Sequence, residues 1–158
     1  MLTVGIADVQ AVYTKDEDLL VTYALGSCVG ICLYDRMAGI AGLAHIMLPW
    51  SKESYKGDDP LRYADTAITE LISRMCAMGA DKSGIAAKTA GGAQMFGYAS
   101  EAFNIGERNI NAVNKVLAAY KIPIVASDVG GVHARTLFFH TDTCIAEVRT
   151  AMKQTVNL

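Results

Sequence analysis

The sequence has few charged residues and no cluster of basic ones. Of its 158 residues 19% are charged and 52% are hydrophobic, and 14 Lys and Arg against 16 Asp and Glu give a net charge of −2. So apolar a composition excludes an intrinsically disordered chain. Because no basic stripe or patch is present, we expect neither nucleic acid nor an anionic membrane surface as a partner.

The sequence also lacks a hydrophobic run long enough to cross a membrane. Its longest uncharged stretch, residues 19–34, is shorter than the roughly 20 residues that a membrane helix needs. The first basic residue is Lys15, and Asp8 precedes it, so the N-terminus does not resemble a signal peptide. We therefore expect no membrane insertion and a cytoplasmic location.

Paired cysteine motifs are missing as well. The four cysteines stand at positions 28, 32, 76 and 144, and none forms a Cys-x-x-Cys pair. Without a secretion signal, this usage is typical of reduced thiols and not of disulfides. Cys28, Cys32 and His45 offer three possible zinc ligands, but the spacing is unusual and no fourth ligand is evident, so we expect no metal site.

Two glycine pairs, Gly91-Gly92 and Gly130-Gly131, lack the signatures of phosphate-binding loops. Neither is followed by Lys-Ser or Lys-Thr, and neither forms a Gly-x-Gly-x-x-Gly pattern. We therefore expect tight turns with positive φ angles at both pairs, and no bound cofactor.

No repeat or linker divides the chain, so we expect residues 1–158 to form one domain. An apolar residue recurs every three or four positions from Leu61 to Met78, which predicts a helix that begins at Asp59-Pro60 and ends at Gly79. A second helix is expected over residues 107–120. Short apolar segments predict strands at residues 3–7, 9–13, 19–24, 29–34, 40–47, 83–89, 122–127, 136–140 and 144–149. These elements predict an α/β domain whose two main helices pack on a mixed sheet, without fixing the strand order.

Residues 29–34 and 40–47 are nearly continuously apolar and flank a short polar turn. We expect them to be neighbouring strands, paired as a hairpin and covered on both faces.

The residues best suited to catalysis lie at positions 22–28, which read Thr-Tyr-Ala-Leu-Gly-Ser-Cys, and at His45 in the apolar segment of residues 40–47. A thiol such as Cys28 needs a neighbouring base to become a thiolate, and an imidazole can take the proton and return it to a leaving group. The turn at Gly26, Ser27 and Cys28 offers backbone N–H groups that can hold an oxyanion. A structural interpretation stays open for each residue: Cys28 as a small buried hydrophobe, His45 as a hydrogen-bonded core histidine and Thr22 as an ordinary strand residue.

Six short motifs are spread over most of the chain. They are Thr22 with residues 25–28, residues 42–49, residues 63–68, Lys88 with residues 91–96, residues 105–109 and residues 128–131. In this order they resemble the CheD family, the chemoreceptor glutamine deamidases of bacterial and archaeal chemotaxis. Two positions depart from the family pattern: Ala90 stands where phenylalanine is usual, and Ala134 stands where glycine is usual.

The resemblance implies a three-layer α/β sandwich with mixed β-sheets and two main helices, related to the catalytic domain of cytotoxic necrotising factor toxins. It implies a triad of Cys28 as nucleophile, His45 as general acid and base, and Thr22 as the residue that orients His45. The implied reaction converts selected glutamine side chains of chemoreceptors to glutamate through a cysteine thioester, with release of ammonia. The implied partners are the cytoplasmic helices of chemoreceptors and the phosphatase CheC, which links deamidation to adaptation.

Two other functions share parts of these features. A non-catalytic regulatory partner of CheC and receptors would use the same fold with Cys28 as a packing residue. A cysteine peptidase or a transglutaminase-like enzyme would use the same thiol chemistry with a different leaving group.

Overall fold

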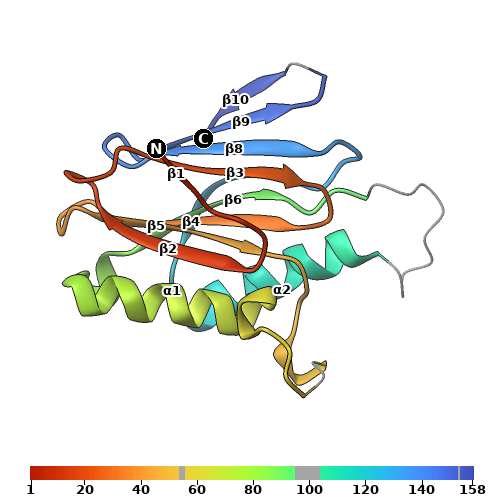
Figure 1. Ribbon diagram of the computed structural model, residues 1–158, viewed down its shortest axis with the longest axis horizontal. Coiled ribbons are helices and arrows are strands. Elements are labelled where there is room, and N and C mark those ends of the chain that lie inside the picture. Colours follow the sequence, from red (N-terminus) through yellow and green to blue (C-terminus); the bar gives the residue numbers. More distant parts are fainter. Residues whose placement is uncertain (54–55, 95–103, 153) are drawn as a thin grey trace.

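The computed structural model describes residues 1–53, 56–94, 104–152 and 154–158. They form three layers: an outer sheet, a central sheet and a layer of two helices (Figure 1). The expected three-layer α/β sandwich with mixed sheets and two main helices is thereby confirmed.

The outer sheet has the strand order β1-β3-β8-β9-β10, in which β1 and β3 run parallel and the other neighbours antiparallel. Its strands are β1 (Leu2–Thr3), β3 (Leu19–Leu25), β8 (Arg135–His140), β9 (Ile145–Thr150) and β10 (Thr155–Asn157).

The central sheet has the order β2-β5-β4-β6-β7, in which only β6 and β7 run parallel. Its strands are β2 (Asp8–Tyr13), β5 (Ile40–Ile46), β4 (Val29–Asp35), β6 (Ala86–Gly91) and β7 (Ile124–Val129). The helices α1 (Ala64–Met78) and α2 (Ile105–Ala119) cover the face of this sheet that is turned away from the outer sheet (Figure 1).

Strand β4 shows how alternation builds the two cores of the molecule. Val29, Ile31 and Leu33 point to the helices and join one apolar cluster, whereas Cys32 and Tyr34 point to the outer sheet and join a second one. All seven residues of β4 and all seven of β5 are buried. The expectation that these two strands pair and are covered on both faces is confirmed.

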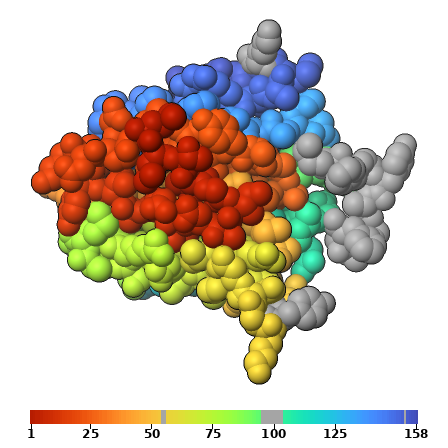
Figure 2. All heavy atoms as spheres, in the orientation of Figure 1, coloured from red at the N-terminus to blue at the C-terminus, as the bar shows by residue number. Residues whose placement is uncertain are grey.

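The N-terminal segment covers the face of the molecule seen in Figure 2, between the C-terminal strands of the outer sheet and α1. The strand expected at residues 3–7 is wrong, because β1 ends at Thr3 and the chain turns at Ala7, where φ is +58°. Val4 nevertheless continues the pairing, since its N–H donates to the Val21 carbonyl at 2.8 Å. This contact brings the Val4 carbonyl close to β3.

The expected start of the first helix is also wrong. Asp59 does accept a hydrogen bond from the N–H of Leu61, but it caps a short 3₁₀ turn at Pro60–Arg62. Tyr63 is extended, with φ −104° and ψ 139°, so that α1 begins only at Ala64. The end at Gly79 is confirmed, because this residue adopts the left-handed conformation with φ +118° and ends the helix.

Further 3₁₀ turns lie at Ser51–Glu53 and Lys82–Gly84, and the second of these replaces the beginning of the strand that was expected at residues 83–89. Neither α1 nor α2 is long and apolar enough to cross a membrane, and no other helix in the described ranges is either.

Candidate functional site

Thr22 of β3 and His45 of β5 meet between the two sheets, where both are buried. The Thr22 hydroxyl oxygen lies 2.7 Å from Nδ1 of His45 and 2.7 Å from the carbonyl oxygen of Val4. A carbonyl can only accept, so the single hydroxyl proton goes to Val4 and the hydroxyl oxygen accepts from Nδ1–H of His45. The hydrogen bonds thus assign the imidazole proton to Nδ1 and leave a lone pair on Nε2.

Nε2 of His45 is buried and finds no hydrogen-bond partner among the residues that the structure describes. A buried acceptor of this kind costs about 1–3 kcal/mol, so an unpaired one calls for a functional explanation. Burial also lowers the pKa of His45 to about 4. The ring is therefore neutral at pH 7, and its Nε2 lone pair is free to take a proton.

Gly30 gives His45 its place between the sheets. The two residues face each other in the β4–β5 register. A Cβ at Gly30 would lie 2.8 Å from Cδ2 of Leu137 and 3.2 Å from Cδ1 of Leu25, both from the outer sheet. A side chain at this position would have to displace Leu137, so glycine leaves the outer-sheet side chains packed directly opposite the histidine.

Cys28 stands directly before β4, two residues ahead of Gly30, and therefore lies on the same face of the central sheet. Its partly buried side chain packs against the cluster between the sheets. In this register Cys28 is a diagonal neighbour of His45, a relation that places Cβ atoms about 7–8 Å apart. The thiol makes no hydrogen bond with the His45 ring here, and burial raises the pKa of Cys28, so the thiol is protonated at neutral pH. Such contacts commonly tighten only when substrate binds.

The turn that carries Cys28 begins at an irregularity of β3. The pairing of β3 with β8 shifts register between Thr22 and Leu25, and Ala24 has a φ of +58°, which is unfavourable for a residue with a side chain. The Gly26 N–H donates to the Ala24 carbonyl at 2.9 Å. The Gly26 N–H is therefore already hydrogen-bonded, which leaves those of Ser27 and Cys28 as candidate donors to an oxyanion.

All three carbonyl groups of the Cys28 turn are held by hydrogen bonds. Those of Gly26 and Cys28 accept from the N–H groups of Ala93 and Gly92, both at 2.8 Å, and that of Ser27 accepts from Nδ2 of Asn109 at 2.9 Å. In contrast, no other described residue accepts from the N–H groups of Ser27 and Cys28, and the Cys28 N–H is directed at its own sulfur. The turn thus presents two backbone donors beside the thiol that no other residue engages.

The first glycine pair is part of this arrangement. Gly91 and Gly92 have φ angles of +113° and +67°, and those of Gly130 and Gly131 are also positive, so the expected positive φ angles are confirmed. The tight turn expected at the first pair is wrong, because Gly91 is the last residue of β6 and pairs with Val29 and Val129. A Cβ at Gly91 would lie 2.2 Å from the Cys28 carbonyl oxygen. Sequence reasoning treated this pair only as a turn and missed that it contacts the Cys28 backbone.

Arg135 supports the same region from the outer sheet. Its guanidinium pairs with the Asp128 carboxylate at 3.3 Å through two nitrogens and reaches the Gly91 carbonyl at 3.5 Å. Ala134, which precedes it, is partly buried, and Ala90 is fully buried between the sheets. Residues 95 and 96, the last two of the motif formed by Lys88 and residues 91–96, lie outside the described residues.

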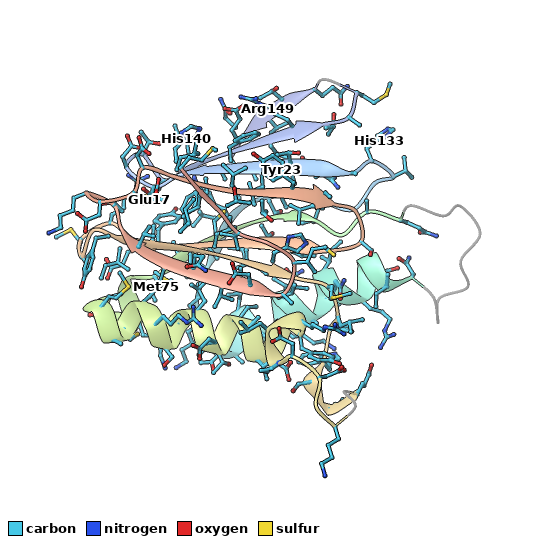
Figure 3. All side chains as sticks on the ribbon, in the orientation of Figure 1. Glu17, Tyr23, Met75, His133, His140 and Arg149 are labelled. Atoms are coloured by element: carbon cyan, nitrogen blue, oxygen red, sulfur yellow. The ribbon has the colours of Figure 1, made fainter. Side chains whose placement is uncertain are left out.

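The other sequence candidates lie apart from this cluster. Cys32 packs in the core between the sheets, and His133 and His140 lie near opposite ends of β8 (Figure 3). Within residues 1–53, 56–94, 104–152 and 154–158, no group of three or more His, Cys, Asp or Glu side chains could hold a metal ion.

Asn109 and Val4 are site residues that sequence reasoning did not identify. The only signal for Asn109 was an asparagine on the apolar side of a helix at the end of the motif at residues 105–109. Nothing in the sequence pointed to the Val4 carbonyl, because its role comes from a contact between strands.

The chain is similar to known proteins of one family. The family described as "CheD chemotactic sensory transduction" matches residues 47–150. A protein of Caldanaerobacter subterraneus subsp. tengcongensis named "Probable chemoreceptor glutamine deamidase CheD" is 47% identical over 144 residues, which cover 90% of this chain and 88% of the relative. A protein of the same name from Clostridium novyi is 43% identical over 151 residues, covering 94% and 92%. The match extends over nearly the whole of both chains, and this chain therefore belongs to the CheD family.

Proposed function

We propose that this protein is a chemoreceptor glutamine deamidase, an amidohydrolase that converts glutamine side chains of receptor helices to glutamate. The relatives carry this activity in their names. The observation that supports it most directly is the Thr22–His45 hydrogen bond, which leaves Nε2 as a base on the face of the sheet where Cys28 lies. The triad is accordingly Cys28, His45 and Thr22.

The first half of the reaction forms a thioester. The sulfur of Cys28 attacks the carboxamide carbon while its proton passes to Nε2 of His45, and the carbonyl oxygen becomes an oxyanion. The N–H groups of Ser27 and Cys28, which no other described residue engages, stabilise this oxyanion. His45 then gives its proton to the nitrogen, the C–N bond breaks, and ammonia leaves.

The second half restores the enzyme. Water gives a proton to Nε2 of His45 and attacks the thioester carbon. The C–S bond breaks, the proton returns to sulfur, and the substrate leaves as glutamate. Thr22 holds the ring through Nδ1 in both halves, as a carboxylate or amide does in other triads. Because a hydroxyl has no full charge, it stabilises the imidazolium less than aspartate would, which agrees with the low pKa of His45.

The product explains a signalling role. Each conversion adds a negative charge to a receptor helix, and like charges along a helical bundle repel. We also propose CheC as a regulatory partner, on the family resemblance. Co-elution of purified CheC with this protein in size-exclusion chromatography would support that contact, and separate elution at micromolar concentrations would exclude it.

Ammonia release from a purified chemoreceptor cytoplasmic fragment tests the activity. We expect release with the wild-type protein and none above background with Cys28→Ala. Cys76→Ala is the matched control, because Cys76 is a partly buried cysteine of α1 at the helix-side core and should keep full activity. Full activity of Cys28→Ala would refute the proposal, and receptor cleavage or amine incorporation would indicate a peptidase or a transglutaminase instead.

Selective alkylation separates an enzyme from a purely regulatory protein. Although burial raises the pKa of Cys28, His45 can take the thiol proton as the sulfur reacts. A nucleophilic Cys28 should therefore react with iodoacetamide faster than the three other cysteines, and His45→Ala should abolish this preference. Four equally unreactive cysteines would favour the non-catalytic interpretation.

A further inference from the structure

Asn109 of α2 connects the turn of Cys28 to the end of the strand of His45. Its side chain is 0% exposed, and Nδ2 donates to the carbonyl oxygens of Ser27 at 2.9 Å and Met47 at 3.0 Å. Both partners are carbonyls, so the orientation of the amide is unambiguous and both Nδ2 protons are used. The two acceptors come from chain segments 82 and 62 residues away in sequence.

These bonds determine the direction of a backbone donor. In a trans peptide unit the C=O and the N–H point in opposite directions, so the Ser27 carbonyl and the Cys28 N–H form one rigid plane. Asn109 lies in the helix layer and holds the carbonyl on that side. The Cys28 N–H must therefore point away from α2, toward the space between the sheets where the Cys28 side chain and His45 lie.

The second bond of Asn109 acts on the strand that carries His45. Met47 directly follows β5, two residues after His45, and its carbonyl is held by the same Nδ2 that holds Ser27. The next peptide N–H, that of Leu48, donates to the Arg62 carbonyl at 3.0 Å, which fixes this peptide from its other side. One side chain thus hydrogen-bonds to both segments that bear the nucleophile and the base.

The remaining atom of the Asn109 side chain shows that packing alone does not explain the residue. Oδ1 is buried and has no partner among the described residues, and together with Nε2 of His45 it is one of two such side-chain atoms there. A residue needed only to fill this position would be better replaced by an apolar side chain of similar size. Position 109 instead needs a side chain with two N–H donors, as the Nδ2 group of asparagine provides.

We infer that Asn109 is a positioning residue for the deamidation, which aims the Cys28 N–H at the oxyanion. The inference rests on the proposed function and extends it to a residue outside the triad. It predicts that loss of Asn109 impairs the step that develops an oxyanion more than it impairs the reactivity of the thiol.

Two rates measured on the same variants separate these effects. Amide hydrolysis needs the oxyanion donor, whereas alkylation of Cys28 by iodoacetamide is a displacement at carbon and develops no oxyanion. For Asn109→Ala we expect kcat for ammonia release to fall about 10- to 100-fold, below the roughly 100- to 1,000-fold cost of removing a donor outright. The KM and the alkylation rate of Cys28 should stay within about threefold of wild type, as expected when only transition-state stabilisation is lost.

Two further variants complete the test. Asn114→Ala removes an exposed asparagine of the same helix and should behave as wild type. Asn109→Ser keeps one donor and should give an intermediate kcat; if Asn109→Ala unfolds below the assay temperature, Asn109→Ser decides by the same two rates. A kcat within about threefold of wild type, or an equal loss in both rates, would overturn the inference. No ammonia release by the wild-type protein would instead overturn the proposed function, so the two failures are distinguishable.

Discussion

Replacing Thr22 by valine removes the hydroxyl that holds His45 and keeps the branched shape of the side chain. In the wild-type protein this hydroxyl accepts from Nδ1–H of His45 and donates to the Val4 carbonyl, both at 2.7 Å. In Thr22→Val the Nδ1–H group loses its acceptor in a buried place. The imidazole of His45 then has two options. Its proton stays on Nδ1 without a hydrogen-bond acceptor, or the other tautomer forms, in which Nε2 carries the proton and cannot act as a base.

The size of the effect follows from this choice. An unpaired buried donor costs about 1–3 kcal/mol, which corresponds to a loss of about 5- to 150-fold in kcat. The KM should stay near its wild-type value, because Thr22 is fully buried and does not contact substrate. Thr22→Ser keeps the hydroxyl and should retain most of the activity. The assay is ammonia release from a receptor cytoplasmic fragment at saturating substrate.

A matched control separates catalysis from stability. Thr141 is also a buried threonine whose hydroxyl donates to a backbone carbonyl, that of Glu17, but it lies beyond the far end of β8. Thr141→Val should lower the free energy of unfolding by a similar amount, about 1–3 kcal/mol, and leave kcat unchanged. A kcat of Thr22→Val within about twofold of wild type would refute the role of the hydroxyl, as would a Thr22→Ser variant that is equally impaired.

Three further predictions follow from the same site. Because burial holds the pKa of His45 near 4, activity at about pH 5.5 should equal that at about pH 7.5, whereas an ordinary histidine would cause a loss of about tenfold that a pH–rate profile would reveal. Because the pKa of His45 is lowered in the folded protein, its contribution to stability is present above about pH 6.5 and is lost as the pH falls toward 4. Over this range the free energy of unfolding, measured with urea, should fall by up to about 3 kcal/mol more in the wild type than in His45→Gln. An equal fall in both proteins would contradict the lowered pKa. Gly91→Ala would place a Cβ 2.2 Å from the Cys28 carbonyl oxygen, in a backbone conformation that disfavours alanine. We expect kcat for ammonia release to fall at least about tenfold, while the thermal unfolding transition stays cooperative. A wild-type kcat would show that the contact is unimportant for catalysis.

The sequence predicted the parts of the fold that depend on local pattern. Continuous apolar runs predicted that β4 and β5 are buried on both faces, and the apolar stripe with Gly79 predicted where α1 ends. The start of α1 was wrong because Asp59 satisfies its capping pattern on a 3₁₀ turn, which sequence does not distinguish from the first turn of a helix. Strand order and the short strand β10 were not predicted, since they depend on pairing between distant segments.

The site divides in the same way. Thiol chemistry alone singled out Cys28 and His45, whereas Thr22 came only from the family resemblance. The catalytic roles stay predictions, but the hydrogen bond between Thr22 and His45 is now a geometric fact. The contacts of Asn109 with Ser27 and Met47, like that of Thr22 with Val4, join a side chain to backbone far away in sequence, and no local pattern encodes such contacts.

Mass spectrometry of a receptor cytoplasmic fragment incubated with this protein tests the central claim most directly. Conversion of glutamine to glutamate at specific positions, with heavy oxygen incorporated from labelled water, is the predicted result for the wild-type protein and for Cys76→Ala. The Cys28→Ala protein should leave every glutamine unchanged. Conversion by Cys28→Ala at the wild-type rate, or no conversion by the wild-type protein, would contradict a cysteine-dependent deamidase.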